Sequence, residues 1–151
     1  MEQRLRTENQ FKSGANWFFW IGGLSLINTI VGLTGAQWGF IIGLGITQLV
    51  DAIAQGTGAV GTVAAVVVDL FVVGVFVLFG VCARKMQTWA FVVGMVLYAL
   101  DGLLFLLAMD FLGIGFHAFA LYQIYRGLAA RNELSEAPAA ARLQTAPSST
   151  V

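Results

Sequence analysis

The stretch that decides the fold is Val60–Lys85, with the sequence VGTVAAVVVDLFVVGVFVLFGVCARK. Residues 60–82 are apolar or small apart from Thr62 and Asp69, and the basic pair Arg84-Lys85 follows almost at once. A helix needs about 20 such residues to cross a hydrocarbon core of about 30 Å. The stretch therefore predicts a transmembrane helix that ends on a basic pair.

Three more apolar stretches predict further spans, over residues 15–34, 88–108 and 111–126. The whole chain is 58% hydrophobic and only 11% charged, whereas a soluble domain carries about 25% charged residues. A soluble fold would have no way to cover so much apolar surface. We therefore expect an all-α integral membrane four-helix bundle, with residues 15–131 as its transmembrane domain.

The basic residues predict the orientation of this bundle. There are eight of them, at Arg4, Arg6, Lys12, Arg84, Lys85, Arg126, Arg131 and Arg142. Four spans place all of them on one side of the membrane, and Lys and Arg in short loops favour the cytoplasmic side. We therefore expect both termini, 1–14 and 132–151, to be cytoplasmic.

Segment 36–59 is apolar enough to suggest a fifth span, but a fifth crossing would move Arg84 and Lys85 to the other side. Its polar residues Gln48, Asp51 and Gln55 have the spacing of one helix face. The opposite face carries a set of apolar residues, Ile42, Ile46, Leu49 and Ile53. This pattern predicts an outer-leaflet helix over about 37–56, either amphipathic and interfacial or re-entrant.

The two ends of the chain are polar. Residues 1–14 form a basic lead, and a signal peptide is an alternative because Thr34-Gly35-Ala36 loosely resembles a cleavage site. The apolar run 17–33 is longer than a usual signal core, so a retained helix fits better. Residues 132–151, with two prolines and a run of Ser and Thr, predict a disordered cytoplasmic tail.

Ionisable residues at bilayer depth are candidates for a functional site. At 1.5 Å per residue, Asp69 and Asp101 both lie about 20 Å from the inner ends of their helices. Asn28 comes at about 18 Å and His117 at about 14 Å. The sequence thus predicts a polar layer inside the bundle, with Tyr98 one turn before Asp101.

This layer has several interpretations. Asp69 and Asp101, if close together, could share a proton, bind a cation or line a small-molecule pocket with Asp51 as a lid. With His117 they are weak candidates for a metal site, because no spacing matches a ligand motif. Alternatively, each aspartate is neutral and hydrogen-bonded, for example to Asn28, Tyr98 or Thr62, and only holds helices together.

Other features point to anchoring rather than chemistry. Aromatic and basic residues at the predicted interface suggest membrane anchors: Trp17, Trp20, Arg84, Lys85, Trp89 and Arg126. The single histidine rules out a bis-histidine haem within one chain, and no cofactor is expected. A net charge of zero gives no indication of nucleic-acid binding. No nucleophile, P-loop or dinucleotide motif is present, which makes an enzyme less probable.

The stretch WAFVVGMVLYALDGLLFLLAMDFLGIGFHAFALYQIYRGLAA, residues 89–130, resembles small bacterial inner-membrane proteins with four spans. The stretches WIGGLSLINT and GLGITQLVDAIAQ belong to the same resemblance, which covers about three-quarters of the chain. It implies a bacterial source and an inner-membrane location, and it brings no assigned activity.

The function expected from these patterns is that of an accessory or structural membrane protein that acts through helix packing. Its partners would be the lipid bilayer and either a second copy of the chain or a larger membrane complex. Two alternatives stay open: a transporter or ligand-binding protein that uses the Asp/Asp/His layer, and a metal-dependent membrane enzyme.

Overall fold

The structure is a computed structural model that describes residues 2–34, 44–54 and 57–145, with side chains up to residue 136. Over these ranges the chain is all-helical, as predicted. The five helices are α1 (Glu2–Leu33), α2 (Gly45–Ala54), α3 (Gly58–Arg84), α4 (Thr88–Leu107) and α5 (Phe111–Thr145). Three of them, α1, α3 and α4, are long and apolar enough to cross a membrane.

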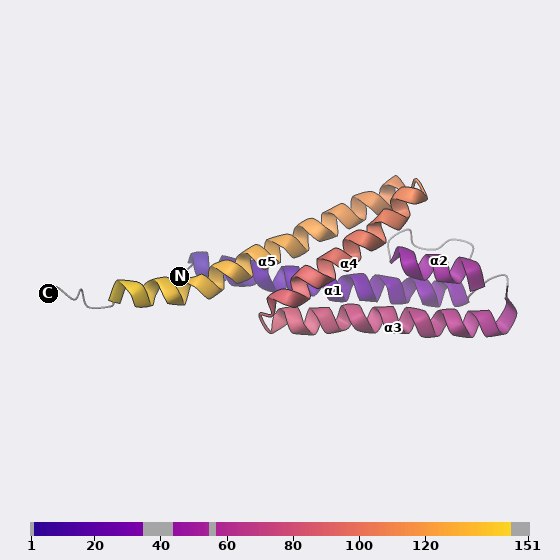
Figure 1. Cartoon of the computed structure of the whole chain (residues 1–151), viewed down its shortest axis with the longest axis horizontal. Helices are drawn as coiled ribbons and strands as arrows, with labels where there is room; N and C mark the ends of the chain where they lie inside the picture. Colours follow the sequence, from indigo (N-terminus) through magenta and orange to yellow (C-terminus); the bar gives the residue numbers. More distant parts are fainter. Residues whose placement is uncertain (1, 35–43, 55–56, 146–151) are drawn as a thin grey trace.

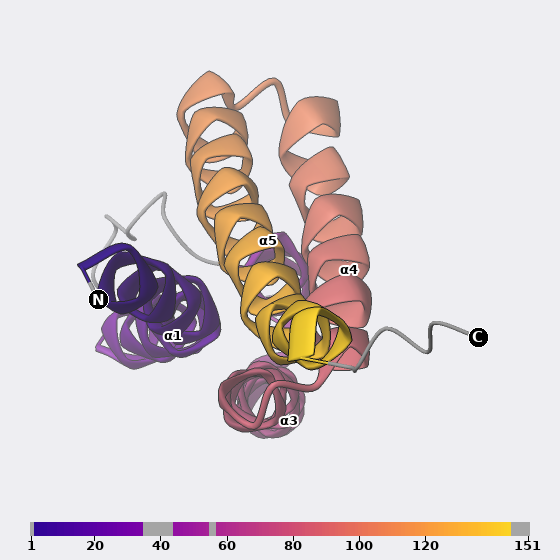
Figure 2. The same ribbon diagram turned by 90° about the vertical axis from the view of Figure 1, so that its left-hand side faces the viewer.

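The long helices form two antiparallel pairs that diverge from one another. Figure 1 shows α1 and α3 side by side, while the hairpin of α4 and α5 leans away from them toward one end. Figure 2 looks along the bundle and shows α4 beside α5, with α1 and α3 on the other side. Contacts between α1 and α5 and between α1 and α3 are the most extensive, so α1 joins the two pairs.

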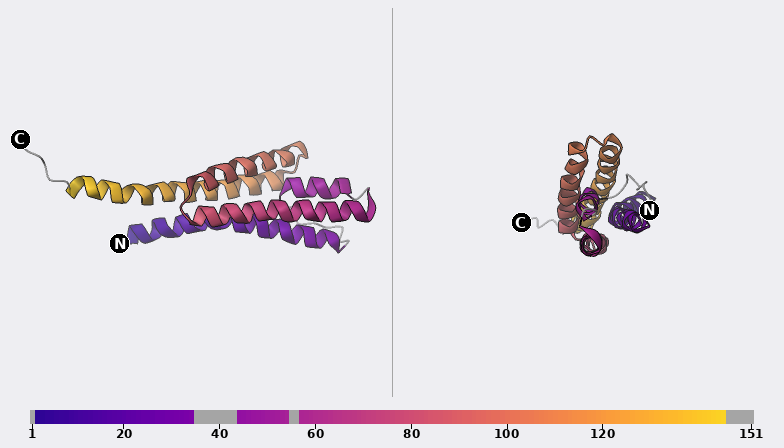
Figure 3. Two further views of the ribbon diagram at one scale, coloured as in Figure 1. Left: turned by 60° about the horizontal axis from the view of Figure 1, so that its bottom comes forward. Right: turned by 90° about the vertical axis from the view of Figure 1, so that its right-hand side faces the viewer.

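The short helix α2 lies in the wedge that this divergence opens. It runs alongside the part of α3 that follows Gly58, with the two helix axes nearly aligned and the chain directions opposite (Figures 1 and 3). Its apolar residues Leu49 and Ile53 are exposed, whereas Thr47 is buried against the bundle. The apolar face of α2 is therefore directed outward, whereas Gln48 and Asp51 of the predicted polar face are half-buried.

Two helix boundaries differ from the predicted ones. α1 begins at Glu2, so the basic lead and the first span are one continuous helix. α5 continues to Thr145, so residues 132–145, predicted to be disordered, are helical. The two extensions support each other, because Thr7 Oγ1 donates to Glu133 Oε1 at 3.2 Å. Residues 35–43, 55–56 and 146–151 of the predicted segments lie outside the described ranges.

The α3–α4 turn and the α4–α5 turn have the same backbone conformation. Met86 and Met109 adopt left-handed backbone conformations, with φ of 65° and 54°. The amide of the following residue then bonds back to the last helical turn, from Gln87 to Cys82 O at 3.2 Å and from Asp110 to Phe105 O at 2.9 Å. These are C-terminal caps that satisfy orphan carbonyls. They reverse the chain within three residues, so the joined helices are neighbours.

The core between α1, α3, α4 and α5 is built mainly from aromatic rings. Phe18 of α1 packs against Phe79 and Phe91, with ring centroids 6.0 Å away in each case. Phe76 continues the stack to Tyr98 at 5.9 Å. This column connects the end of the bundle near the 84–87 turn with the buried polar residues described below.

Where α1 crosses α5, two glycines bring the backbones into contact. A Cβ added to Gly14 would lie only 2.4 Å from the Cα of Gly127. Neither position therefore has room for a side chain. Small residues that allow such close approach are typical of helix pairs in membranes.

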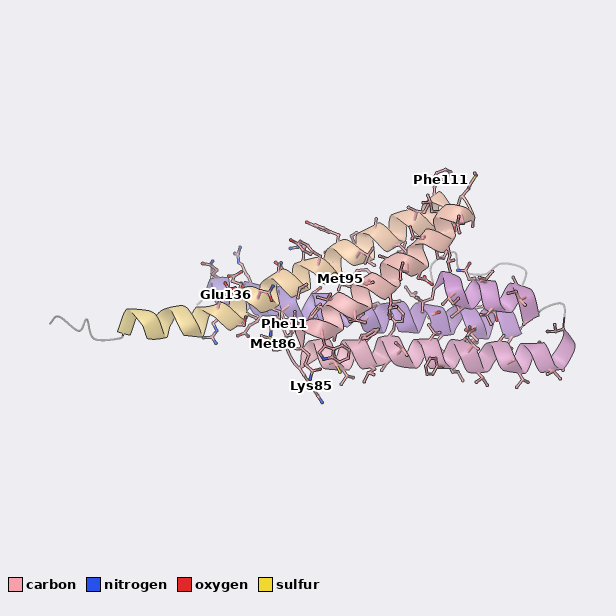
Figure 4. All side chains as sticks on the ribbon, in the orientation of Figure 1. Phe11, Lys85, Met86, Met95, Phe111 and Glu136 are labelled. Carbon is pink, nitrogen blue, oxygen red and sulfur yellow. The ribbon has the colours of Figure 1, made fainter. Side chains whose placement is uncertain are left out.

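The basic residues gather at one end of the molecule. Arg84 Nε donates to Asn16 Oδ1 at 2.9 Å, and Arg131 Nε donates to Met86 O at 2.9 Å. Figure 4 shows Lys85 and Phe111 at opposite ends of the α4–α5 hairpin. Basic segments far apart in sequence are thus brought to the same end, as the charge pattern requires.

Candidate functional site

Asp101 is the centre of the buried polar residues. It lies on the inward face of α4, and its carboxyl group takes part in three hydrogen bonds. Two come from the backbone amides that begin α2, Gly45 N to Oδ2 at 2.8 Å and Ile46 N to Oδ1 at 2.9 Å. Because the first amides of a helix have no partner within it, Asp101 acts as an N-terminal cap supplied by another helix.

His117 of α5 provides the third bond to Asp101. Its Nε2 lies 2.9 Å from Asp101 Oδ2, and its Nδ1 lies 2.9 Å from Gly113 O. A carbonyl can only accept, so Nδ1 must carry a proton. A second proton must then lie between Nε2 and Oδ2, and the pair has no net charge, whether it is imidazolium with carboxylate or imidazole with carboxylic acid.

Aromatic side chains enclose this pair. The ring of Tyr98 stacks on His117 with centroids 4.2 Å apart and an interplanar angle of 16°. Phe105 covers another side at 4.7 Å. Tyr98 is fully buried, and its hydroxyl has no hydrogen-bond partner among the residues described. The rings keep water away from the Asp101–His117 pair, which makes its hydrogen bonds stronger.

Asp69 has a different partner from the one that a single polar layer suggests. Its Oδ2 lies 2.7 Å from Thr29 Oγ1 of α1, and no hydrogen bond joins it to Asp101 in the described part of the chain. Across the described ranges, no three His, Cys, Asp or Glu side chains come together as metal ligands. The proposed set of Asp69, Asp101 and His117 therefore does not form one metal site.

Hydroxyl groups, which the sequence did not single out as site residues, connect the helices between the two aspartates. Thr29 Oγ1 also lies 3.2 Å from Ser25 O, and Ser25 Oγ lies 3.3 Å from Thr47 Oγ1 of α2. Thr47 in turn donates to Leu44 O at 2.8 Å. Serine and threonine can bond to their own helix, so their presence in an apolar segment predicts nothing by itself. The spacing of Ser25 and Thr29 on one face was the available signal.

The remaining candidates lie around this centre. Asn28 is half-buried on α1, and its neighbour Thr29 is the residue that reaches Asp69. Asp51 of α2 is half-buried and lines a cavity between α1, α2 and α3. Partial burial raises the pKa of the Asp51 carboxyl. The structure thus brings Tyr98, Asp101 and His117 together and keeps Asp51 and Asp69 apart from them.

The predicted anchors lie toward the basic end. Trp20 and Trp89 are exposed, whereas Trp17 is half-buried against Phe119 at 5.3 Å. Arg84 lies over the ring of Phe19 at 4.6 Å, and Arg126 lies over Tyr122 at 5.8 Å. Lys85 follows Arg84 in the turn to α4. These contacts leave cationic groups at one end of an apolar surface, the arrangement that an interface favours.

Comparisons with protein-family models, with curated proteins and with solved structures found no match. The structure of the chain therefore defines its class: a helical protein with three candidate membrane spans. Its buried polar centre is the Asp101–His117 pair, in which Asp101 caps the short helix α2.

Proposed function

We propose that the chain is a four-span inner-membrane protein of the accessory or structural type. The spans are α1, α3, α4 and the first half of α5, with both termini in the cytoplasm. The observation that carries the proposal is the engagement of Asp101, whose carboxylate accepts two α2 amides and pairs with His117. Asp101, an ionisable group whose burial costs free energy, therefore joins α4 to α2 and α5.

The fourth crossing is supported by packing. α5 lies antiparallel to α4 and contacts α1 extensively, so its apolar part occupies the same depth as theirs. The outward side chains of α5 near its start, Phe111 and Leu112, are exposed and apolar. A crossing at 111–126 also keeps Arg84, Lys85 and Arg126 on one side.

The placement of α2 favours the re-entrant alternative for segment 37–56. α2 runs antiparallel to α3 rather than across its end, and its first residue meets Asp101 in the interior of the bundle. Exposed Leu49 and Ile53 would face lipid, while the helix backbone is covered by protein at its buried end. The N-terminal end of its dipole then points at a carboxylate.

The contacts give less support to transport or to metal-dependent catalysis by the Asp/Asp/His layer. Asp69 is bonded to Thr29 instead, and both oxygens of Asp101 are occupied. An accessory role needs only a stable helical surface. Such a surface is present in the exposed apolar side chains of α3 and α4, including Phe71 and Leu100.

The topology is tested by cysteine accessibility in a Cys82→Ala background. We expect Met109→Cys to react with a membrane-impermeant maleimide in intact cells and Met86→Cys to react only after lysis, because the turns lie at opposite ends. Labelling of both positions, or of neither, in intact cells would contradict the four-span arrangement.

The accessory role is tested by native mass spectrometry of the full-length protein from mild detergent. We expect multiples of the chain mass or a complex with a second polypeptide, unchanged in Asp101→Asn. A small-molecule or metal mass that is present in the wild type and absent from a folded Asp101→Asn protein would contradict a structural role of Asp101.

A further inference from the structure

The outer half of the bundle contains an anionic cavity that the structural role of Asp101 does not use. It has a volume of about 300 Å³ and lies between α1, α2 and α3. Its polar lining residues are Thr29, Asp51 and Thr62, each from a different helix. A volume of about 300 Å³ is at the lower end of the range for small-molecule sites.

Asp69 lies just beyond the inner end of this cavity and is not one of its described lining residues. It follows the lining residues Thr62, Ala65 and Val66 on the same face of α3, at helical spacings of seven, four and three residues. Its side chain is bonded through Oδ2 to Thr29, which also lines the cavity. Asp69 is 1% exposed, and within the described ranges its Oδ1 has no hydrogen-bond partner. Buried carboxylate oxygens normally have a partner, so this one indicates a missing donor.

The polar groups of the cavity can accept hydrogen bonds, but their own donors are already in use. Thr62 Oγ1 donates to Gly58 O at 3.3 Å, and Thr29 Oγ1 has Ser25 O and Asp69 Oδ2 as acceptors. Asp51 lines the same cavity as Thr29, the hydrogen-bond partner of Asp69, so the two carboxylates belong to the same part of the bundle. No Lys or Arg occurs between Lys12 and Arg84, so these helices bring no cation to the cavity.

We propose that this cavity binds a small organic ammonium compound, which donates hydrogen bonds to Asp51 and is also attracted by the charge of Asp69 behind the inner wall. The volume limits the ligand to roughly ten water-sized groups, at about 30 Å³ each. Charge-assisted N–H bonds to carboxylates are the strong kind, and a low-dielectric wall increases their contribution. The described lining residues include no aromatic ring, and ring faces are what recognise quaternary ammonium groups, so primary amines fit these residues better.

Calorimetry with the full-length protein in mild detergent tests this proposal. The probes are butylammonium, 1,4-diaminobutane, tetramethylammonium and sodium, all as chlorides at one pH and ionic strength. We expect the two primary amines to bind, the diamine more tightly because both carboxylates attract its two positive charges. Tetramethylammonium and sodium should bind at least about tenfold more weakly, since neither can donate a hydrogen bond.

Three variants locate the site. Asp69→Asn and Asp51→Asn should each weaken amine binding by about tenfold or more through loss of charge. Asp110→Asn is the matched control, because Asp110 is an acidic residue outside the cavity. Its Oδ1 caps α5 by accepting from the Leu112 and Gly113 amides, a role that asparagine can fill. Asp51 is half-exposed, so its variant keeps the test valid if Asp69→Asn fails to fold.

Several outcomes would overturn the proposal. Absence of amine binding by the wild type would do so, as would equal binding by wild type and folded Asp51→Asn. Preferential binding of sodium would identify a metal-ion site instead. A further outcome is a wild type that binds no amine and whose melting temperature depends on pH, with this dependence lost in Asp69→Asn. It would mean that protons alone neutralise the carboxylates at the cavity. None of these outcomes changes the topology or the role of Asp101.

Discussion

At the scale of single residues, Asp101 differs from Asp69 in how completely it is bonded. Both oxygens of Asp101 accept hydrogen bonds from backbone amides, and Oδ2 also pairs with His117. Among the described residues, Asp69 bonds through one oxygen only. A fully bonded buried carboxylate rigidifies its surroundings, whereas a half-bonded one is a candidate for a ligand or a proton. The two aspartates therefore have separate expected roles.

The role of Asp101 is tested by Asp101→Ala. Removal of the carboxylate leaves the Gly45 and Ile46 amides buried without an acceptor, at a cost of about 1–3 kcal/mol for each unsatisfied group. We expect a lower free energy of unfolding in detergent and faster hydrogen exchange at these two amides. Asp101→Asn keeps one carbonyl oxygen and should lose less stability.

Asp110→Asn, a carboxylate-to-amide change at an exposed helix cap, is the control for loss of charge alone. If Asp101→Ala leaves exchange at Gly45 and Ile46 unchanged, Asp101 does not hold the beginning of α2.

Sequence reasoning identified the buried ionisable residues better than it predicted which groups they contact. Asp69, Asp101 and His117 are conspicuous because ionisable residues are rare in apolar helices. Their depths placed them in one layer, but depth says nothing about direction around the bundle. Thr29 meets Asp69, and the start of α2 meets Asp101. The second contact involves backbone amides, which no side-chain pattern reveals.

At the scale of helices, the crossing of α1 and α5 depends on two glycines. A Cβ added to Gly127 would lie 2.6 Å from the Cα of Gly14, and a backbone cannot move aside as a flexible side chain can. Gly127→Ala should therefore push the helices apart and lower the free energy of unfolding by about 1–3 kcal/mol. Chemical unfolding in mixed micelles measures this change.

Gly115→Ala is the matched control on the same helix, because an added Cβ at Gly115 meets nothing within 4 Å. Alanine favours a helix over glycine by about 1 kcal/mol, so Gly115→Ala should be neutral or stabilising. Equal destabilisation by both substitutions would mean that the close approach at Gly127 is not what holds α1 to α5.

The sequence predicts that the long helices exist, but it does not predict where α1 begins and where α5 ends. Length and hydropathy identify α1, α3 and α4, because crossing a bilayer requires a continuous apolar run. The polar ends of α1 and α5 carry no apolar stripe of their own, so the sequence does not show that they continue the spanning helices. They are helical because they pack on one another, with Phe11 and Ala130 buried and Thr7 bonded to Glu133.

At the scale of the whole molecule, these paired extensions continue the bundle beyond its basic end. Arg131 of α5 also bonds to Met86 O in the α3–α4 turn, so the extension of α5 contacts two other parts of the chain. The extensions are therefore part of the fold rather than appendages. The chain from Gly127 to Glu136 should contribute measurably to its stability.

Two C-terminal truncations test this role. A chain ending at Glu136 keeps every described side-chain contact of α5 and should melt within about 2 °C of the full-length protein in detergent. A chain ending at Arg126 loses Gly127, Ala130, Arg131 and Glu133, and with them the crossing with α1 and the bond to the 84–87 turn. It should melt several degrees lower or fail to give a single species in size-exclusion chromatography, because α1 then exposes Phe11 and Thr7. Equal melting temperatures for the two truncations would mean that the bundle up to Arg126 is sufficient and that the extensions only cover its end.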